Sequence, residues 1–114
     1  MLAHEERPWG SFTDLYHTEF TRVKTLVVLP RQRLSLQSHS RRAENWTVVL
    51  GTATIEINGE IFHCEPGESI QIPTGAKHRL ENNTSELLEV IEVQTGDYFG
   101  EDDIVRYEDD YQRC

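Results

Sequence analysis

Two segments of the chain, 37–51 and 67–82, contain side chains that could together bind one divalent metal ion. Successive side chains of a strand alternate between its two faces, so Gln37 and His39 share a face. Two imidazoles, one carboxylate and one amide oxygen suit a borderline or hard divalent ion that keeps open positions for water or substrate. A single histidine in a strand is usually an ordinary hydrogen-bonded residue, but the two segments together favour a metal site. The predicted ligands are Gln37, His39, Glu44 and His78.

Short strands joined by turns are expected to position these side chains. Asn58-Gly59 is a strong hairpin signal, and Pro73-Thr-Gly75 predicts a turn in which glycine supplies an unusual backbone angle. So many short strands need their edges paired or covered, which favours an antiparallel β-sandwich or jelly-roll barrel. A short helix over 102–107 is expected near the end of the chain. The expected strands are 11–16, 21–29, 34–39, 44–50, 52–58, 60–64, 69–72, 78–82 and 87–94.

Length and charge limit the classes of function. A chain of 114 residues is expected to form one domain, 1–114, with one modest core. The net charge of −9 argues against nucleic acid and anionic membrane surfaces as partners, and any phosphate site must be a local basic pocket. Cys64 and Cys114 make no disulfide framework, which fits a reducing compartment. Neither a membrane-length apolar run nor a signal peptide is recognisable, so a cytoplasmic protein is expected.

The two segments resemble the two signature motifs of the cupin superfamily. That family usually begins its first motif with His-x-His, and Gln37 stands here at the place of the first histidine. A closer resemblance, to the type II phosphomannose isomerase domain, covers nearly the whole chain. It implies a cupin jelly roll and a domain that is often the C-terminal part of bifunctional enzymes that also make GDP-mannose. The matching segments are 7–11, 34–53, 72–82, 89–96 and 98–113.

The resemblance implies the interconversion of mannose 6-phosphate and fructose 6-phosphate, within the synthesis of precursors for polysaccharides. This reaction moves a proton between neighbouring carbons through an enediol. It needs a metal to stabilise the enediolate, a general base, and a cationic group that binds the phosphate. Zinc is the first choice of metal, with cobalt, manganese and nickel as alternatives. The nucleotidyltransferase half is absent from the sequence, so a separate nucleotidyltransferase is an expected pathway partner.

Candidate residues for the base and the phosphate site follow from strand alternation and from the resemblance. Arg42 lies two residues before Glu44 and is expected to point into the cavity, where it would bind the phosphate. Glu92 lies in an apolar strand. If it points inward its pKa rises, as a base requires, and if it points outward it is an ordinary surface or ion-paired residue. Arg42 and Lys77 are further candidates for catalysis, and Lys77, Arg79 and Trp46 are candidates for substrate binding. Arg106 and Arg113 either fold back over the cavity or form salt bridges, and their acidic neighbours favour salt bridges.

The chain differs from the family pattern at three positions where histidines are common, which here are Ser40, Arg41 and Asn45. A second hypothesis is therefore a non-catalytic cupin that binds a sugar phosphate or nucleotide sugar and regulates a partner enzyme. A third is a metal-dependent enzyme of another type, such as an oxygenase, although Gln-x-His suits redox iron less well than His-x-His does. A homodimer is expected, because small cupins often pair sheet edges.

Overall fold

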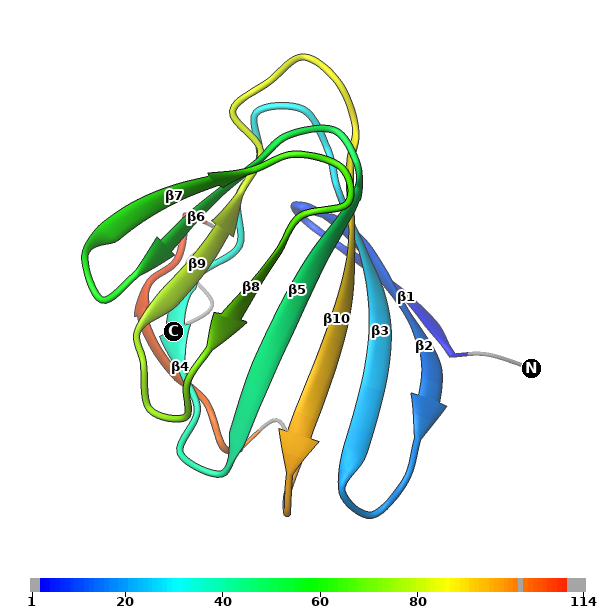
Figure 1. Cartoon of the computed structure of the whole chain (residues 1–114), viewed down its shortest axis with the longest axis vertical. Coiled ribbons are helices and arrows are strands. Elements are labelled where there is room, and N and C mark those ends of the chain that lie inside the picture. The colour runs from blue at the N-terminus through cyan, green and yellow to red at the C-terminus, as the bar shows by residue number, and fades with distance from the viewer. Residues whose placement is uncertain (1–2, 101, 111–114) are drawn as a thin grey trace.

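The structure, a computed structural model, describes residues 3–100 and 102–110. These residues form two antiparallel β-sheets that pack face to face, with the core between them (Figure 1). One sheet has the strand order β1-β2-β3-β10-β5-β8, and the other has the order β11-β4-β9-β6-β7. The strands are β1 (His4–Arg7), β2 (Gly10–His17), β3 (Thr21–Val28), β4 (Leu36–Ser38), β5 (Arg42–Leu50), β6 (Ala53–Ile57), β7 (Glu60–Cys64), β8 (Ser69–Ile72), β9 (His78–Glu81), β10 (Leu88–Gly96) and β11 (Val105–Glu108). The expected antiparallel β-sandwich is confirmed.

Alternation along the three central strands of the larger sheet decides which side chains enter the core. Their inward residues are Lys24, Leu26 and Val28 of β3, then Glu44, Trp46 and Val48 of β5, and Leu88, Val90, Glu92 and Gln94 of β10. The register aligns these residues in rows across the strands. Rows near one end of the strands are wholly apolar, and rows near the other end are polar. The sandwich therefore has an apolar core at one end and a chamber with polar walls at the other.

The apolar core supplies most of the driving force for folding. Val28, Leu88 and Val90 on one sheet face Ile55 and Leu80 on the other, and none of these five exposes any surface to solvent. Each such side chain contributes about 1.5–3 kcal/mol when it is fully buried. Because the apolar end of the sandwich holds the fold together, the polar chamber at the other end can deviate from ideal packing.

Glycines close the turns that bring the two motifs together. Gly51 has a φ of 85°, and a Cβ atom at this position would lie 2.4 Å from the carbonyl oxygen of Leu87. A larger residue would therefore displace the backbone where β5 turns into β6. Asn58 and Gly59 both have positive φ angles, 50° and 87°, as the predicted two-residue hairpin requires. Gly75, with a φ of 83°, likewise has the angle that its predicted turn needs.

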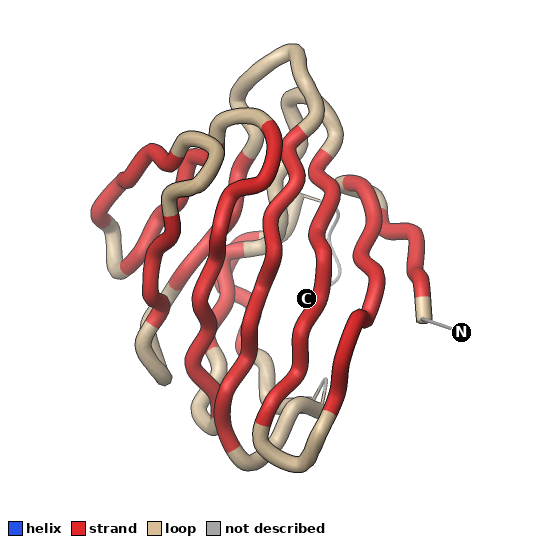
Figure 2. The backbone as a smooth tube through the Cα atoms, turned by 45° about the vertical axis from the view of Figure 1, so that its right-hand side comes forward, coloured by secondary structure: helices blue, strands red, loops and turns tan. Residues whose placement is uncertain are grey.

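Two elements near the chain ends differ from expectation. The helix expected over 102–107 was wrong, because Val105–Glu108 is instead the strand β11, which pairs with β4. Its residues include Val105 and Tyr107, which favour strands, and β4 offers an otherwise open edge. The strand β1 was not expected either, and it extends the larger sheet along β2 (Figure 2). Arg113 and Cys114 lie outside the described residues. In the described part of the chain, no helix is long and apolar enough to cross a membrane.

Candidate metal centre

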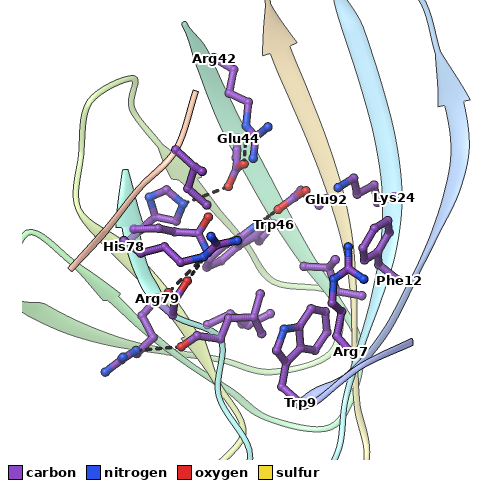
Figure 3. A pocket seen from close by; sticks show the side chains of 17 residues that line it. Arg7, Trp9, Phe12, Lys24, Arg42, Glu44, Trp46, His78, Arg79 and Glu92 are labelled. Carbon is purple, nitrogen blue, oxygen red and sulfur yellow. Dashed lines mark hydrogen bonds and ion pairs between the residues drawn. The ribbon is translucent and has the colours of Figure 1, made fainter. Parts of the chain in front are cut away.

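Three of the four predicted ligands meet in the polar chamber. His39 follows β4, Glu44 is the third residue of β5, and His78 opens β9. Each offers one ligand atom, and these atoms all lie within 4.8 Å of one another. All three side chains are nearly inaccessible to solvent, and Figure 3 shows Glu44 and His78 pointing toward each other. Gln37 lies directly opposite His78 in the pairing of β4 with β9 and lines the same cavity.

Backbone carbonyl groups orient both imidazoles. His39 Nδ1 lies 2.8 Å from the carbonyl oxygen of Asp103, and His78 Nδ1 lies 2.9 Å from that of Ala76. A carbonyl oxygen can only accept, so each Nδ1 carries a proton and donates it. The Nε2 atoms then lie 3.7 Å (His39) and 3.3 Å (His78) from Glu44 carboxylate oxygens. This is the arrangement by which proteins fix the tautomer of a histidine that binds a metal through Nε2.

Glu44 supplies the observation that tests whether a metal fits. Its Oε1 atom is buried and accepts no hydrogen bond from any described residue, although His78 Nε2 is only 3.3 Å away. A carboxylate oxygen and an imidazole lone pair repel each other at this distance unless a proton or a cation lies between them. The Gln37 amide nitrogen donates to Ser35 Oγ at 3.1 Å, which engages the nitrogen of that amide rather than its oxygen. The donor set therefore fits a divalent cation.

Arg42 already places a positive charge beside this cluster. Its Nε donates to Glu44 Oε2 at 3.0 Å, and an Nη atom donates to His39 Nε2 at 3.0 Å. The prediction from alternation, that Arg42 shares the inward face of Glu44, is confirmed by these contacts. Accepting a hydrogen bond at Nε2 also identifies His39 as a neutral imidazole.

Burial and neighbouring charges shift the pKa values in this cluster in different directions. Burial lowers the pKa of His39 and outweighs the attraction of Glu44. Burial alone would raise the pKa of Glu44, but the close ionic contact with His78, with Arg42 nearby, reverses this and lowers it. For His78, burial is outweighed by Glu44, and the pKa is raised. Glu44 is thus an ionised carboxylate, as a metal ligand must be.

Glu92 points inward, which decides between the two alternatives for this residue. It is 6% exposed, and it lies between Lys24 and Trp46 in the register of the sheet. Trp46 Nε1 donates to Glu92 Oε2 at 2.8 Å, and Gln94 Nε2 donates to Oε1 at 2.6 Å. Burial and the negative charge of Glu44 raise its pKa, against the opposing effects of Lys24 and Arg42. The cavity therefore contains a carboxyl group that is held in place by two donors and protonates easily.

Comparison with known proteins identifies the family. The sequence matches the family described as "Mannose-6-phosphate isomerase C-terminal" over residues 2–109. The chain belongs to this family. Among curated relatives, the mannose-1-phosphate guanylyltransferase ManC of Salmonella typhimurium is 49% identical over 94% of this chain. The xanthan biosynthesis protein XanB of Xanthomonas campestris is 47% identical over 94% of this chain. The chain spans only 22% of the length of ManC and 23% of XanB.

Solved structures confirm the fold at lower sequence identity. The cupin domain of Schizosaccharomyces pombe Cnp3 superposes with a TM-score of 0.73 at 12% identity, covering 76% of this chain and 64% of that one. At this identity the likeness shows the fold alone. The predicted cupin jelly roll is therefore confirmed, and the family membership agrees with the resemblance of the two motifs.

The three positions that depart from the family pattern lie outside the lining of the cavity. Ser40 is exposed, and its Oγ donates to Asp103 Oδ1 at 2.7 Å. Arg41 is exposed and pairs with Asp97, and Asn45 donates to the Gln71 side chain on the outer face of β8. The departures therefore change the surroundings of the metal cluster without replacing a side chain that lines the cavity.

The other predicted substrate-binding residues differ in their placement. Trp46 is 2% exposed and forms part of the cavity wall, beside His78. Arg79 also lines the cavity, but its guanidinium donates to the carbonyl oxygen of Leu34 and to Glu108. Lys77 is exposed, with its Nζ 4.4 Å from the centre of the Tyr107 ring, and is absent from the cavity lining in the described part of the chain.

Sequence reasoning missed two groups of residues around the site. Lys24 and Gln94 are inward and buried, and the alternation of β3 and β10 carried this signal. Asp103 holds the loop after β4, since its carbonyl oxygen orients His39 and its carboxylate accepts from the backbone nitrogen atoms of residues 40 and 41. Arg106 lines the cavity, which was the alternative to its expected salt bridge, and no ion pair between described residues includes it.

Proposed function

We propose that this chain is a metal-dependent aldose–ketose isomerase that interconverts mannose 6-phosphate and fructose 6-phosphate. The observation that carries the proposal is that Glu44 and His78, two members of a cluster of metal-binding type that also includes His39, line the same cavity as Glu92, a buried carboxyl group of raised pKa. Membership of the family described as "Mannose-6-phosphate isomerase C-terminal" supports the choice of sugar. The names of ManC and XanB support a place in sugar-nucleotide and polysaccharide synthesis.

Four residues would hold the metal ion. When bound, a divalent metal supplies Lewis acidity that stabilises negative charge on the two substrate oxygens. Zinc suits two imidazoles and a carboxylate, and cobalt, manganese and nickel accept the same donors. The proposed ligands are Gln37, His39, Glu44 and His78.

Glu92 is the proposed general base. In its ionised form it would take the proton from the carbon next to the carbonyl and return it to the neighbouring carbon. In the first step the carbon–hydrogen electron pair forms the carbon–carbon double bond of the enediol, and the carbonyl electrons move onto the carbonyl oxygen, which takes up a proton. In the second step the hydroxyl group on the carbon that lost its proton gives up its own proton and becomes the new carbonyl group, while the double-bond electrons take the proton from Glu92 at the neighbouring carbon. Trp46 and Gln94 hold the two carboxylate oxygens, so the base stays in one orientation while the proton moves. Its raised pKa brings it closer to the operating pH, which suits both steps.

Arg42 would assist at the same end of the cavity. It donates to Glu44 and His39, so its charge is available beside the atoms where the enediolate would form. Trp46 would act as a wall against which the sugar packs. Arg79 has its donors engaged by Leu34 and Glu108, so we assign it support of the cavity wall rather than contact with substrate. Lys77 would take part only from outside the cavity.

We also propose a homodimer and a pathway link to a nucleotidyltransferase. The relatives named guanylyltransferases are about four times longer than the segment they share with this chain. Their remaining length supports a linked or separate nucleotidyltransferase that uses the mannose phosphate. Light scattering after size-exclusion chromatography measures the mass directly, and a particle of 13.2 kDa would exclude the dimer.

The experiment is a coupled assay that detects fructose 6-phosphate formed from mannose 6-phosphate. The protein is stripped of metal with a chelator and then supplied with zinc, cobalt, manganese or nickel in turn. Turnover that depends on added metal is the expected result. A folded, metal-loaded protein without turnover for any of the four metals would refute the isomerase and favour a non-catalytic sugar-phosphate-binding cupin.

A further inference from the structure

One of the three clustered metal ligands is held differently from the other two. Glu44 and His78 lie in β5 and β9, and each is paired with a residue on the strand at either side. His39 lies in the loop between β4 and β5, and no strand residue in the described part of the chain pairs with it. The position of this ligand therefore depends on the contacts that hold the loop.

Asp103 holds this loop through four contacts. Its Oδ1 atom accepts from the backbone nitrogen of Ser40 at 3.1 Å and from the Ser40 hydroxyl at 2.7 Å, and its Oδ2 atom accepts from the backbone nitrogen of Arg41 at 2.9 Å. Its carbonyl oxygen accepts from His39 Nδ1 at 2.8 Å. A further hydrogen bond, from the backbone nitrogen of Gly75 to the carbonyl oxygen of His39, holds the other side of the loop. The carboxylate of Asp103 thus fixes the loop backbone, while its main chain orients the ligand imidazole.

Asp103 belongs to a segment that covers the cavity without joining the apolar core. This segment, the strap, comprises residues 102–110 and contains β11, which pairs with β4 at the edge of the smaller sheet (Figure 1). Ile104 and Arg106 of the strap line the cavity. Among the described residues, none of the strap belongs to the buried apolar cluster between the sheets. The strap therefore forms a wall of the polar chamber from outside the core.

Polar contacts attach the strap to the smaller sheet. Arg79 donates to the Glu108 carboxylate at 3.2 Å and to the Glu108 carbonyl oxygen at 3.1 Å. The hydroxyl oxygens of Ser38 and Tyr107 lie 2.9 Å apart. Val105 is 54% exposed and Tyr107 is 42% exposed, so β11 buries little apolar surface. Because segments with few buried apolar contacts open locally at less cost than global unfolding, the strap can detach while the sandwich stays folded.

We infer that Asp103 is a positioning residue for the metal ligand His39, and that docking of the strap is coupled to metal binding. With the strap docked, Asp103 holds the loop and His39 presents its Nε2 atom 3.7 Å from a Glu44 carboxylate oxygen. With the strap detached, the loop and the imidazole lose their acceptors together, and the cluster loses one fixed ligand.

The coupling acts in both directions. If docking of the strap strengthens metal binding, then metal binding strengthens docking by the same factor, because coupling between two equilibria is reciprocal. The metal centre itself rests on the proposed function, but the coupling is a property of binding and needs no turnover. It is therefore measured on metal affinity and on the loop, independently of the isomerase assay.

The experiment measures the dissociation constant for zinc, by competition with a chromophoric chelator, for the wild-type chain and three variants. Asp103→Ala removes both carboxylate acceptors, and Asp103→Asn keeps one acceptor oxygen. Asp97→Ala is the matched control, because the Asp97 carboxylate contacts the same loop only through the exposed side chain of Arg41. Zinc binding should weaken roughly 10- to 100-fold in Asp103→Ala, less in Asp103→Asn, and not at all in Asp97→Ala.

Two further readouts separate positioning from a general loss of stability. The visible absorption of the cobalt-loaded protein reports the geometry of the ligands, so it should change in Asp103→Ala and stay as in wild type in Asp97→Ala. Hydrogen exchange at the amides of Ser40 and Arg41 reports docking of the strap, because both donate to Asp103. In the wild-type chain, saturating zinc should slow the exchange of these two amides by a factor similar to the loss of zinc affinity in Asp103→Ala.

The outcomes separate the positioning role from the proposed function. Weakened zinc binding in Asp103→Ala supports the role even if the isomerase assay shows no turnover. A folded Asp103→Ala with the wild-type zinc constant and cobalt spectrum, an equal loss in Asp97→Ala, or amide exchange that zinc leaves unchanged would overturn it and leave the isomerase to its own assay. A wild-type chain that binds no zinc would refute the metal centre and the coupling together. If Asp103→Ala does not fold, Asp103→Asn and Ser40→Ala decide, since each removes only part of the contact.

Discussion

Replacing Glu92 with glutamine should separate the requirements of catalysis from those of stability. The substitution keeps the shape of the side chain and an oxygen that accepts from Trp46 Nε1. The new amide nitrogen can donate to Gln94 Oε1, which is buried and has no partner among the described residues, once the Gln94 amide rotates. The change therefore removes a charge and a proton acceptor with little disturbance of packing. Because a general base contributes roughly 10²- to 10⁴-fold, we expect kcat to fall by that factor.

Glu92→Gln should lower kcat but raise the stability of the folded protein at neutral and higher pH. The pKa of Glu92 is raised in the folded protein, mainly by burial, so the folded state prefers the protonated carboxyl group. Its contribution to stability is complete below the unfolded pKa of 4.5 and is lost as the pH rises through the folded value. Each pH unit between the two values costs about 1.4 kcal/mol. The neutral glutamine avoids this loss, so the variant should be more stable than wild type at pH 8 and nearly equal at pH 4.5.

Two measurements test this reasoning together. Thermal unfolding of both proteins at pH 4.5 and pH 8 gives the stability difference, where each kcal/mol moves the midpoint by about 4–8 °C for a domain near this size. The isomerase assay on metal-loaded protein gives kcat, and metal analysis shows that both proteins carry the same amount of ion. A variant that is inactive and also less stable than wild type at pH 8 would refute the reasoning, because it would show that the ionised Glu92 does not destabilise the folded protein.

Three further substitutions test the ligands, the second motif and an ion pair. Glu44→Gln should lose stoichiometric metal, measured by elemental analysis after dialysis, and metal retained at full occupancy would contradict the ligand assignment. Asn82→Ala should destabilise the fold by about 3 kcal/mol in urea unfolding, because this buried amide donates to three backbone carbonyl oxygens; a change under 1 kcal/mol would exclude that role. Asp14→Asn should cost about 1 kcal/mol at pH 7, because Arg22 lowers the pKa of Asp14. That contribution is present above the unfolded pKa and is lost as the pH falls through the lowered one, so the two proteins should converge in acid; a difference that persists there would refute the assignment.

Strand alternation predicted which side chains of one strand share a face, because the same rule governs burial. Arg42 and Glu44 were expected to share the inward face of β5, and they do. The predicted strands and turns were mostly correct, because hairpins and short strands depend on neighbouring residues. The register that brings Gln37 opposite His78 depends on pairing between segments 41 residues apart, and only the family resemblance connected them in advance.

Partners of the cations could not be predicted, because they depend on contacts between distant segments. Arg79 reaches Glu108 on a strand that was expected to be a helix, so its engagement was invisible in the sequence. The local sequence around 102–107 favours neither a helix nor a strand strongly. The segment forms the strand β11 because the edge of β4 is open to pair with it. Lys24 was overlooked because a lysine in a strand is usually solvated, although alternation placed it with Leu26 and Val28.

The hydrogen-bonding defects of the described residues gather at the polar end of the sandwich. Only three buried side-chain polar atoms in this part of the chain lack a partner: Glu44 Oε1, Gln94 Oε1 and Arg106 Nε. Glu44 and Gln94 are paired in the register of the larger sheet, and Arg106 borders the same cavity from the other sheet. A buried polar atom without a hydrogen-bond partner costs about 1–3 kcal/mol. The three such atoms therefore lower the stability of the fold at its polar end. The apolar end, with its fully buried valines and leucines, allows the fold to tolerate that loss. Two acceptors and a guanidinium donor left open together are the complement of a bound cation and a bound anion, which a metal ion and a sugar phosphate would supply.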